Sequence, residues 1–144
     1  MSSFYGTYSY SLDSKGRLAI PADIRRQAAD ATTYYLVPGF EGCIALYTES
    51  GWARIEERLR RQPKGGRKLR AFKRALLMHA TRVTVDAQGR ITIPSALIDR
   101  AALRKEAVLL GQDTHVEIWN PERLGRAVAE ADKHFEDLAE DVFD

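Results

Sequence analysis

One short motif occurs twice in this chain, first as Leu12-Asp13-Ser14-Lys15-Gly16-Arg17-Leu18-Ala19-Ile20-Pro21 and again as Val85-Asp86-Ala87-Gln88-Gly89-Arg90-Ile91-Thr92-Ile93-Pro94. Aspartate, glycine, arginine, isoleucine and proline recur at the same places in both copies. The correspondence continues downstream, where residues 35–38 and 44–47 match residues 108–111 and 116–119. Such spacing indicates a duplicated unit whose copies pack as near equivalents, so differences between the copies are informative.

Each copy predicts the same local structure. Alternating residues from Tyr5 to Leu12 predict a strand, and a hairpin turn follows at Asp13–Gly16, because Asp accepts hydrogen bonds from the backbone two residues on and Gly supplies a positive φ. A return strand is expected over Arg17–Ile20, and a helix beginning at Pro21 would bury Ile24 and Ala28. The remaining expected elements are strands over 34–38, 43–48, 81–85, 90–93, 107–111 and 115–119, and a second proline-led helix over 94–102.

Three further helices are expected outside the strands. Ser50 would cap a helix that places Trp52, Ile55 and Leu59 on one face. After a break over residues 62–66, a second helix over 67–80 would carry Leu69, Phe72, Leu76 and His79 at helical spacing. Asn120-Pro121 predicts the start of a C-terminal helix. Its buried stripe would consist of Leu124, Val128, Ala131, Phe135 and Leu138.

These patterns predict an α+β protein. Each strand pair is too short to be stable alone, but two interlocked β-repeats could close a small split barrel with helices packed outside. We expect the first repeat and its helix over residues 1–60, a connecting helix over 61–80, and the second repeat with a C-terminal helix and acidic tail over 81–144. The halves would form one interlocked structural unit.

Composition narrows the class of protein. The chain has 144 residues, 44% of them hydrophobic and 29% charged, which is typical of a globular protein. No apolar run approaches the roughly 20 residues of a membrane span, and the first residues lack the pattern of a signal peptide. A lone cysteine, Cys43, forms no intrachain disulfide and suits a reducing compartment. We therefore expect a cytoplasmic protein with no membrane partner.

Charge is unevenly distributed, although the formal net charge is only +2. Residues 54–74 contain ten Lys or Arg against two Glu, whereas residues 120–144 contain three basic against eight acidic groups. This polarity predicts an anionic partner, or basic and acidic faces that meet between neighbouring subunits. The basic stretch is expected to be a solvated helix–loop–helix with a mobile loop over 64–68. The alternatives are long-range attraction of DNA and a bridge to an acidic neighbour. The acidic end is expected to be a solubilising tail, and regulation of partner binding or of DNA access is the alternative.

The two turns are the main candidates for chemistry. In each, Asp and Arg lie close enough for an ion pair that would simply hold the turn. Alternatively, the first turn offers Lys15 and Arg17 to phosphates or to guanine edges, where Arg can donate two hydrogen bonds at once. Lys15 corresponds to Gln88, and the pair Arg25-Arg26 corresponds to Ile98-Asp99 in the second copy. We infer that the first repeat faces an anion and that the second mainly builds the framework.

Motifs for other chemistry are missing from the sequence. His79, His115 and His134 lack metal-ligand spacing. We expect His79, at a helix end, to be structural and Cys43, among apolar strand residues, to belong to the core. No nucleophile motif or phosphate-binding loop occurs. We therefore expect no enzymatic activity, no cofactor, no metal and no small-molecule substrate.

The motifs taken together resemble the MraZ family of bacterial transcriptional regulators, which consist of two tandem SpoVT/AbrB-type DNA-binding units. The resemblance covers roughly residues 1–125. It is carried by Phe4-x-Gly6, Leu12-Asp13-x-Lys15-Gly16-Arg17-Leu18, Ile20-Pro21, Arg25, Leu76-x-x-His79-Ala80, Asp86-x-x-Gly89-Arg90-Ile91 and Gly111-x-x-x-x-Val116-Glu117-Ile118-Trp119.

This resemblance implies a double-split β-barrel with peripheral helices and a DNA-contacting set. The set maps to Arg17, Arg25 and Arg26, to which the charge comparison adds Lys15. Asp13, Gly16, Asp86, Gly89 and Arg90 would be structural turn residues. The resemblance also implies a ring-shaped homo-oligomer, association with the nucleoid, and double-stranded DNA containing G-rich direct repeats upstream of a cell-division and cell-wall gene cluster.

Two other functions stay open at this point. AbrB-type units also serve as antitoxin-like interaction modules, in which the helical tail holds a partner protein, although such antitoxins usually carry a single copy of the unit. The third possibility is a structural ring whose basic surface binds nucleic acid without sequence preference.

Overall fold

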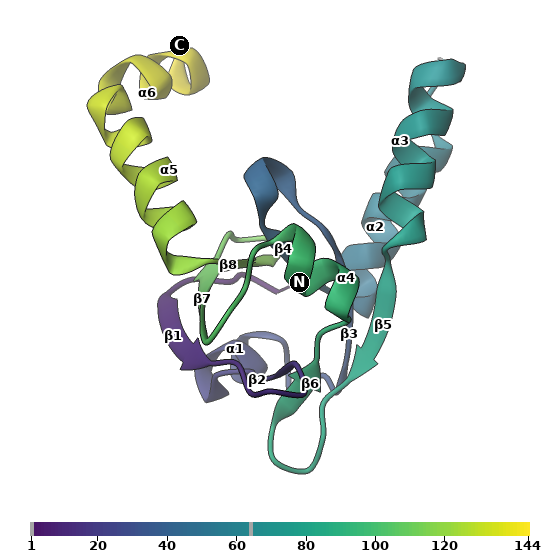
Figure 1. The fold of residues 1–144 in the computed structure, drawn as a ribbon. Helices are drawn as coiled ribbons and strands as arrows, with labels where there is room; N and C mark the ends of the chain where they lie inside the picture. Colours follow the sequence, from purple (N-terminus) through teal and green to yellow (C-terminus); the bar gives the residue numbers. More distant parts are fainter. Residues whose placement is uncertain (1, 64) are drawn as a thin grey trace.

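A computed structural model describes residues 2–63 and 65–144. The strands are β1 (Thr7–Ser11), β2 (Arg17–Ala19), β3 (Thr33–Pro38), β4 (Ile44–Thr48), β5 (Thr81–Thr84), β6 (Arg90–Thr92), β7 (Glu106–Gly111) and β8 (Val116–Trp119). The helices are α1 (Ala22–Gln27), α2 (Glu49–Arg60), α3 (Arg67–Met78), α4 (Ser95–Arg100), α5 (Pro121–Lys133) and α6 (Phe135–Phe143), with a short 3-10 turn at Phe40–Gly42. The α+β class is confirmed (Figure 1). Lys64, in the expected mobile loop, lies outside the described residues.

Strands from the two repeats are exchanged. Six strands form an antiparallel sheet in the order β1-β7-β8-β4-β3-β5, and β2 pairs with β6 in a separate two-stranded ribbon. Both Asp turns form as predicted, with hydrogen bonds from the N–H of Asp13 to the Arg17 carbonyl and from the N–H of Asp86 to the Arg90 carbonyl. The expected pairing of the strands on either side is wrong, because beyond the first turn only a bridge between Leu12 and Leu18 is present among the described residues. β1 and β2 pair with β7 and β6 of the other repeat, whereas β3 pairs with β4 and β7 with β8 inside one repeat, as the sequence predicts.

The register of the strands follows an internal two-fold symmetry. At the centre of the ribbon Leu18 lies opposite Ile91, and these two residues are equivalent in the sequence repeat. At the centre of the sheet Ala45 lies opposite Glu117, again an equivalent pair. The two halves are thus interlocked rather than placed side by side. Closure of sheet and ribbon into a complete barrel stays a prediction.

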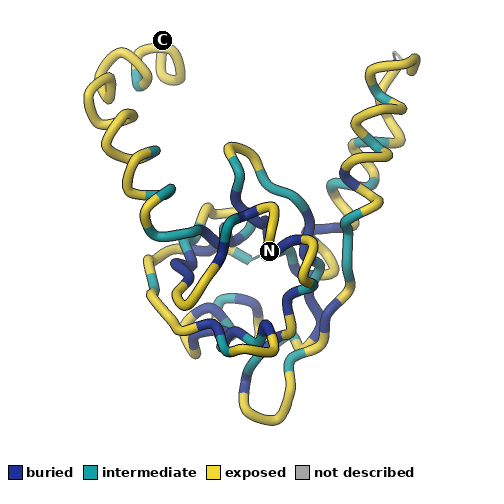
Figure 2. The backbone as a smooth tube through the Cα atoms, viewed as in Figure 1, coloured by how far each residue is buried: buried dark blue, intermediate teal, exposed yellow. Residues whose placement is uncertain are grey.

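The main core lies between the inner face of the sheet and the ribbon. Leu18 and Ile91 from the ribbon pack in one cluster with Leu36, Leu46, Leu109 and Ile118 from the sheet. Ile24 of α1 and Leu97 of α4 complete it, and all eight of these side chains are buried. Ile24 and Ala28 are buried as the sequence predicts. Figure 2 shows the buried residues concentrated in this central part of the molecule.

Two smaller clusters lie on the outer face of the sheet, where the long helices attach. Trp52 and Leu76 from α2 and α3 pack over Val37 and Ala45. Leu124 from the start of α5 packs near Cys43, Val108 and Trp119. Beyond these contacts the helices extend away from the sheet as two separate arms, both largely exposed (Figures 1 and 2). None of the described helices is long and apolar enough to cross a membrane.

Two details of these helices differ from expectation. The hydroxyl of Thr48, not that of Ser50, caps α2 by accepting from the backbone N–H of Gly51 at 3.1 Å. The expected buried stripe on the C-terminal helix is also wrong beyond Leu124, because all its later members are exposed, namely Val128, Ala131, Phe135 and Leu138. Asn120 does cap α5 as predicted, since its side-chain oxygen accepts from the N–H of Arg123 at 3.0 Å.

Strand exchange predicts that one half of the chain has no folded monomeric form. A fragment of residues 1–80 retains β1 and β2 but lacks their partners β7 and β6. We expect it to be unfolded or to fold only by pairing with a second fragment, as far-UV circular dichroism and sedimentation velocity would show. A fragment that unfolds cooperatively as a monomer would contradict the exchange.

Candidate nucleic-acid interface

The first turn is organised by one carboxylate. The Oδ1 atom of Asp13 accepts from the backbone N–H groups of Lys15 and Arg17 at 2.9 and 2.8 Å. Its Oδ2 atom accepts from Nε of Arg17 at 2.7 Å. Gly16 supplies the positive φ of 77° that the turn requires. Asp13 therefore fixes both the turn and the direction of the Arg17 side chain.

The second turn repeats this geometry. Oδ1 of Asp86 accepts from the N–H groups of Gln88 and Arg90 at 2.8 and 2.9 Å, and Oδ2 accepts from Nε of Arg90 at 3.1 Å. Gly89 has a φ of 78°. Asp13, Gly16, Asp86, Gly89 and Arg90 all take part in the geometry of the two turns. Hydrogen bonds from the backbone of Arg17 and of Arg90 lower the pKa of Asp13 and Asp86 respectively.

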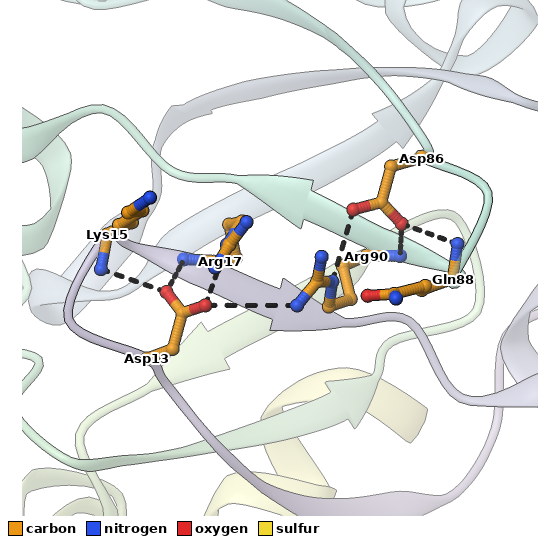
Figure 3. A network of polar contacts seen from close by, with 6 residues as sticks. All are labelled: Asp13, Lys15, Arg17, Asp86, Gln88 and Arg90. Atoms are coloured by element: carbon orange, nitrogen blue, oxygen red, sulfur yellow. Dashed lines mark hydrogen bonds and ion pairs between the residues drawn. The ribbon is translucent and has the colours of Figure 1, made fainter.

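The ribbon brings the two turns into one polar network. Arg17 lies opposite Thr92, and Ala19 lies opposite Arg90. Side chains alternate between the faces of a strand, so burial of Leu18 and Ile91 leaves Arg17 and Arg90 on the outer face. Nη1 of Arg90 lies 3.9 Å from Oδ2 of Asp13, which connects the repeats (Figure 3). The result is a rigid, two-stranded surface with two arginines held in defined orientations.

Each short helix covers the turn of the other repeat. An added Cβ at Gly16 would lie 3.0 Å from Cδ1 of Ile98 in α4. An added Cβ at Gly89 would lie 3.4 Å from Cζ of Arg25 in α1. Two backbone bonds reinforce the crossing, from the N–H of Ile20 to the Gly89 carbonyl and from the N–H of Ile93 to the Gly16 carbonyl. Gly16 and Gly89 thus allow a side chain of the other repeat's short helix to approach the turn closely, in addition to adopting a positive φ.

This crossing separates the four cations predicted as a DNA-contacting set. Lys15 and Arg17 lie on the first turn, whereas Arg25 lies against the second turn and donates from Nε to the carbonyl of Ile20 at 3.2 Å. Arg26 is exposed on α1 and pairs with Asp23. Sequence reasoning missed that Arg25 adjoins the turn of Gln88 and Arg90. The alignment of the two repeats gave no signal of this contact between Arg25 and the second turn, because the contact depends on strand exchange.

Comparison with known proteins places the chain in a family. A sequence model described as "MraZ protein, putative antitoxin-like" matches residues 3–75 and 76–144. The chain is 40% identical to the transcriptional regulator MraZ of Pediococcus pentosaceus, over 98% of this chain and 97% of that protein. It is 38% identical to proteins of the same name from Ligilactobacillus salivarius and Natranaerobius thermophilus, with the same coverage of both chains. The chain belongs to the MraZ family.

The two matched segments of the MraZ family model coincide with the internal repeat, since each contains one Asp-x-x-Gly-Arg turn. Because β1 and β2 pair with β7 and β6, the boundary between these segments does not separate two folded bodies. The candidate surface of this family member is accordingly the ribbon shared by both repeats.

Other candidate residues have structural surroundings. Cys43 is buried, and desolvation raises the pKa of its thiol to about 12, which keeps it protonated and unreactive near neutral pH. His115 stacks on Tyr47 with ring centroids 5.0 Å apart. In the part of the chain that the structure describes, no group of three or more His, Cys, Asp or Glu is placed to hold a metal ion. The basic residues of α2 and α3 belong to an arm on the face of the sheet opposite the ribbon (Figure 1).

The turn carboxylates predict a specific dependence of stability on acid. Since the pKa values of Asp13 and Asp86 are lowered from 3.8 in the folded chain, their stabilising effect is complete above the unfolded pKa and disappears as the pH falls through the folded pKa. We expect the free energy of unfolding to fall below about pH 4. In the double variant Asp13→Asn/Asp86→Asn this decrease should be shallower, as urea unfolding across that pH range would measure.

The matched control for this experiment is Asp132→Asn, which removes an exposed carboxylate on α5, on the opposite face of the sheet. It should keep the acid dependence of the unmodified protein. An equally steep decrease in the double variant would show that the turn carboxylates do not cause it.

Proposed function

We propose that this protein is a sequence-specific, double-stranded DNA-binding transcriptional regulator and performs no catalysis. The observation that carries this proposal is the β2–β6 ribbon, whose outer face presents Arg17 and Arg90 beside carboxylates that orient them. The major groove of B-DNA admits a two-stranded ribbon, and arginine is the side chain best suited to guanine edges. The relatives named transcriptional regulator MraZ support the same function.

Within this proposal Arg17 is the principal base-reading residue. Its Nε donates to Asp13, so this bond leaves the terminal amino groups of the guanidinium to donate to a guanine. Lys15, exposed at the tip of the same turn, lines the groove beside it. Two hydrogen bonds from one planar group would discriminate guanine from other bases, in agreement with a preference for G-rich sites.

Arg25 and Arg26 would contact the phosphate backbone and set the register of the ribbon on the duplex. Arg26 is exposed on α1, whereas Arg25 would reach the duplex beside the second turn. In this arrangement Gln88 and Arg90 adjoin the contact made by Arg25, so the second repeat provides framework immediately next to DNA. The proposed fold at this site is the double-split barrel of SpoVT/AbrB-type proteins, with sheet and ribbon as its parts.

The proposed targets are G-rich direct repeats upstream of a cell-division and cell-wall gene cluster, which would place the protein at the nucleoid. A ring-shaped homo-oligomer would present one ribbon per subunit along an arc. Repeats about one helical turn apart lie on one face of the duplex, so adjacent subunits can each bind one repeat. Sites that bind weakly one at a time then bind strongly together.

Replacing Arg17 tests the base-reading role. We expect Arg17→Ala to weaken binding to a direct-repeat duplex by about 5- to 150-fold, because each bidentate contact to a base contributes about 1–3 kcal/mol of discrimination. Binding to a scrambled duplex should change less, so the preference between the two duplexes shrinks. Fluorescence anisotropy with both duplexes measures this.

The control is Arg126→Ala, which removes the same side chain and the same charge from α5, on the other face of the sheet. It should leave the preference between the two duplexes unchanged. If Arg17→Ala binds both duplexes as the unmodified protein does, Arg17 has no role in recognition.

Replacing Arg25 tests the phosphate-binding role. Arg25→Ala should lower affinity on all sequences alike and reduce the slope of log K against log salt by about 0.9 for each phosphate that the variant no longer neutralises. Titrations at several salt concentrations measure this slope. A change in base preference with an unchanged slope would instead place Arg25 at the bases.

A further inference from the structure

The two ends of the ribbon have the same backbone geometry. An internal two-fold axis passes between Leu18 and Ile91, which lie opposite each other at the centre of the ribbon. This axis relates the first turn to the second, and in each turn an aspartate accepts hydrogen bonds from the same two backbone N–H groups. A difference between the two ends in what they can bind therefore comes from the side chains that each end exposes.

The residues next to the axis are the same in both repeats. Arg17 and Arg90 are equivalent, and each donates from Nε to the aspartate of its own turn, at 2.7 and 3.1 Å. Figure 3 shows these two arginines between Lys15 and Gln88, which lie toward opposite ends of the polar network. Two identical arginines in equivalent places give the two ends of the ribbon the same base preference.

The tips of the two turns differ. Lys15 and Gln88 are equivalent and exposed, and their backbone N–H groups donate to Asp13 and Asp86 at 2.9 and 2.8 Å. An ammonium group only donates hydrogen bonds, so it suits the N7 and O6 acceptors of guanine. A carboxamide both donates and accepts, which matches the N7 acceptor and the N6 amino donor of adenine. The two tips thus favour different bases.

The short helices beside the turns add a second difference. α1 places Arg25 against the second turn and carries Arg26 next to it, whereas α4 places Ile98 against the first turn and has Asp99 next to it. A pair of cations beside the second turn suits the phosphate backbone, and contacts of that kind set the position of a protein on the duplex. Gln88 therefore lies at the end of the ribbon where phosphate contacts would hold it at a fixed distance from the bases.

We propose that Gln88 is a second base-reading residue, which contacts an adenine at the end of the site opposite to the guanine read by Arg17 and Lys15. A ribbon with identical tips would read a palindrome, because the symmetry of a DNA site mirrors that of the protein. Unlike tips make the site directional, so the ribbon binds it in one orientation. This inference rests on the proposed function and goes beyond it, since it gives the second repeat a base contact of its own.

Giving both turns the same tip tests this proposal. The experiment selects bound duplexes from a pool with a random window of about ten base pairs, which is about one helical turn. The unmodified protein should select guanine at one end and, on the complementary strand, adenine at the other end, so that the motif is not a palindrome. Gln88→Lys should select a palindrome with guanine at that position of both strands.

Removing the carboxamide tests the adenine contact by itself. The unmodified protein should prefer adenine over the other bases at this position by about 5- to 150-fold, the range that one bidentate contact to a base supports. In Gln88→Ala this preference should disappear, while the guanine preference at the other end of the site stays. Competition anisotropy with duplexes that differ at this one base pair measures both preferences.

The matched control for the charge change is Gln112→Lys. It adds the same charge in the exposed turn between β7 and β8, outside the ribbon, α1 and α4, and should leave the selected motif directional. The comparison uses the base preference at each position, because an added cation strengthens binding to all sequences alike. Lysine fits the turn at position 88, since Lys15 occupies the equivalent place in the first turn, and circular dichroism checks that the variant is folded.

Four results would overturn the proposal. These are a palindromic motif for the unmodified protein, a base other than adenine at the Gln88 end, a motif unchanged in Gln88→Lys, or an adenine preference that survives in Gln88→Ala. Failure of this proposal is distinguishable from failure of the proposed function. A selected motif that depends on Arg17 and not on Gln88 contradicts only the second base contact, whereas selection of no motif at all contradicts both.

Discussion

Pairing of β2 with β6 is the interaction on which the remaining structure depends. It joins equivalent strands of the two repeats, with Leu18 opposite Ile91 and both buried in the shared core. Because these side chains point inward, alternation along each strand sends Arg17 and Arg90 outward. One constraint therefore fixes the core, couples the halves and creates one surface to which both Asp-x-x-Gly-Arg turns contribute.

Symmetry of the backbone makes the differences in side chains meaningful. Each short helix packs against the turn of the other repeat. A side chain of α1 therefore contacts the second turn, and a side chain of α4 contacts the first. Arg25 lies over Gly89, whereas its equivalent Ile98 lies over Gly16. Because of this crossing, Lys15 and Arg17 lie on the first turn, whereas Arg25 lies beside the second turn. The second turn has Gln88 at the position that Lys15 occupies in the first. The ribbon gains positive charge at both ends, although the first repeat supplies most of it.

Local features were predictable from the sequence, including the pairing of β3 with β4 and of β7 with β8, whereas pairing between the repeats was not. The Asp turns, the burial of Ile24 and the cap at Asn120 depend on residues within a few positions of one another, and each was predicted. The strand partners of β1 and β2 were not, because an apolar pattern specifies a face without specifying the strand beside it. The stripe from Val128 to Leu138 was predicted as buried for a similar reason: periodicity indicates that a face needs cover, not which chain provides it.

The ribbon and the two helical arms lie on opposite sides of the sheet. The ribbon is short, and its outer face offers few side chains for direct contact with bases, so a single copy has limited means to distinguish one site from many similar ones. Linking several copies raises effective affinity only if the links leave every ribbon free. The two helical arms attach to the opposite face of the sheet and so leave the outer face of the ribbon uncovered. The strand exchange that builds the ribbon also builds the sheet to which both arms attach, so the proposed recognition surface cannot form without the core that the two repeats share.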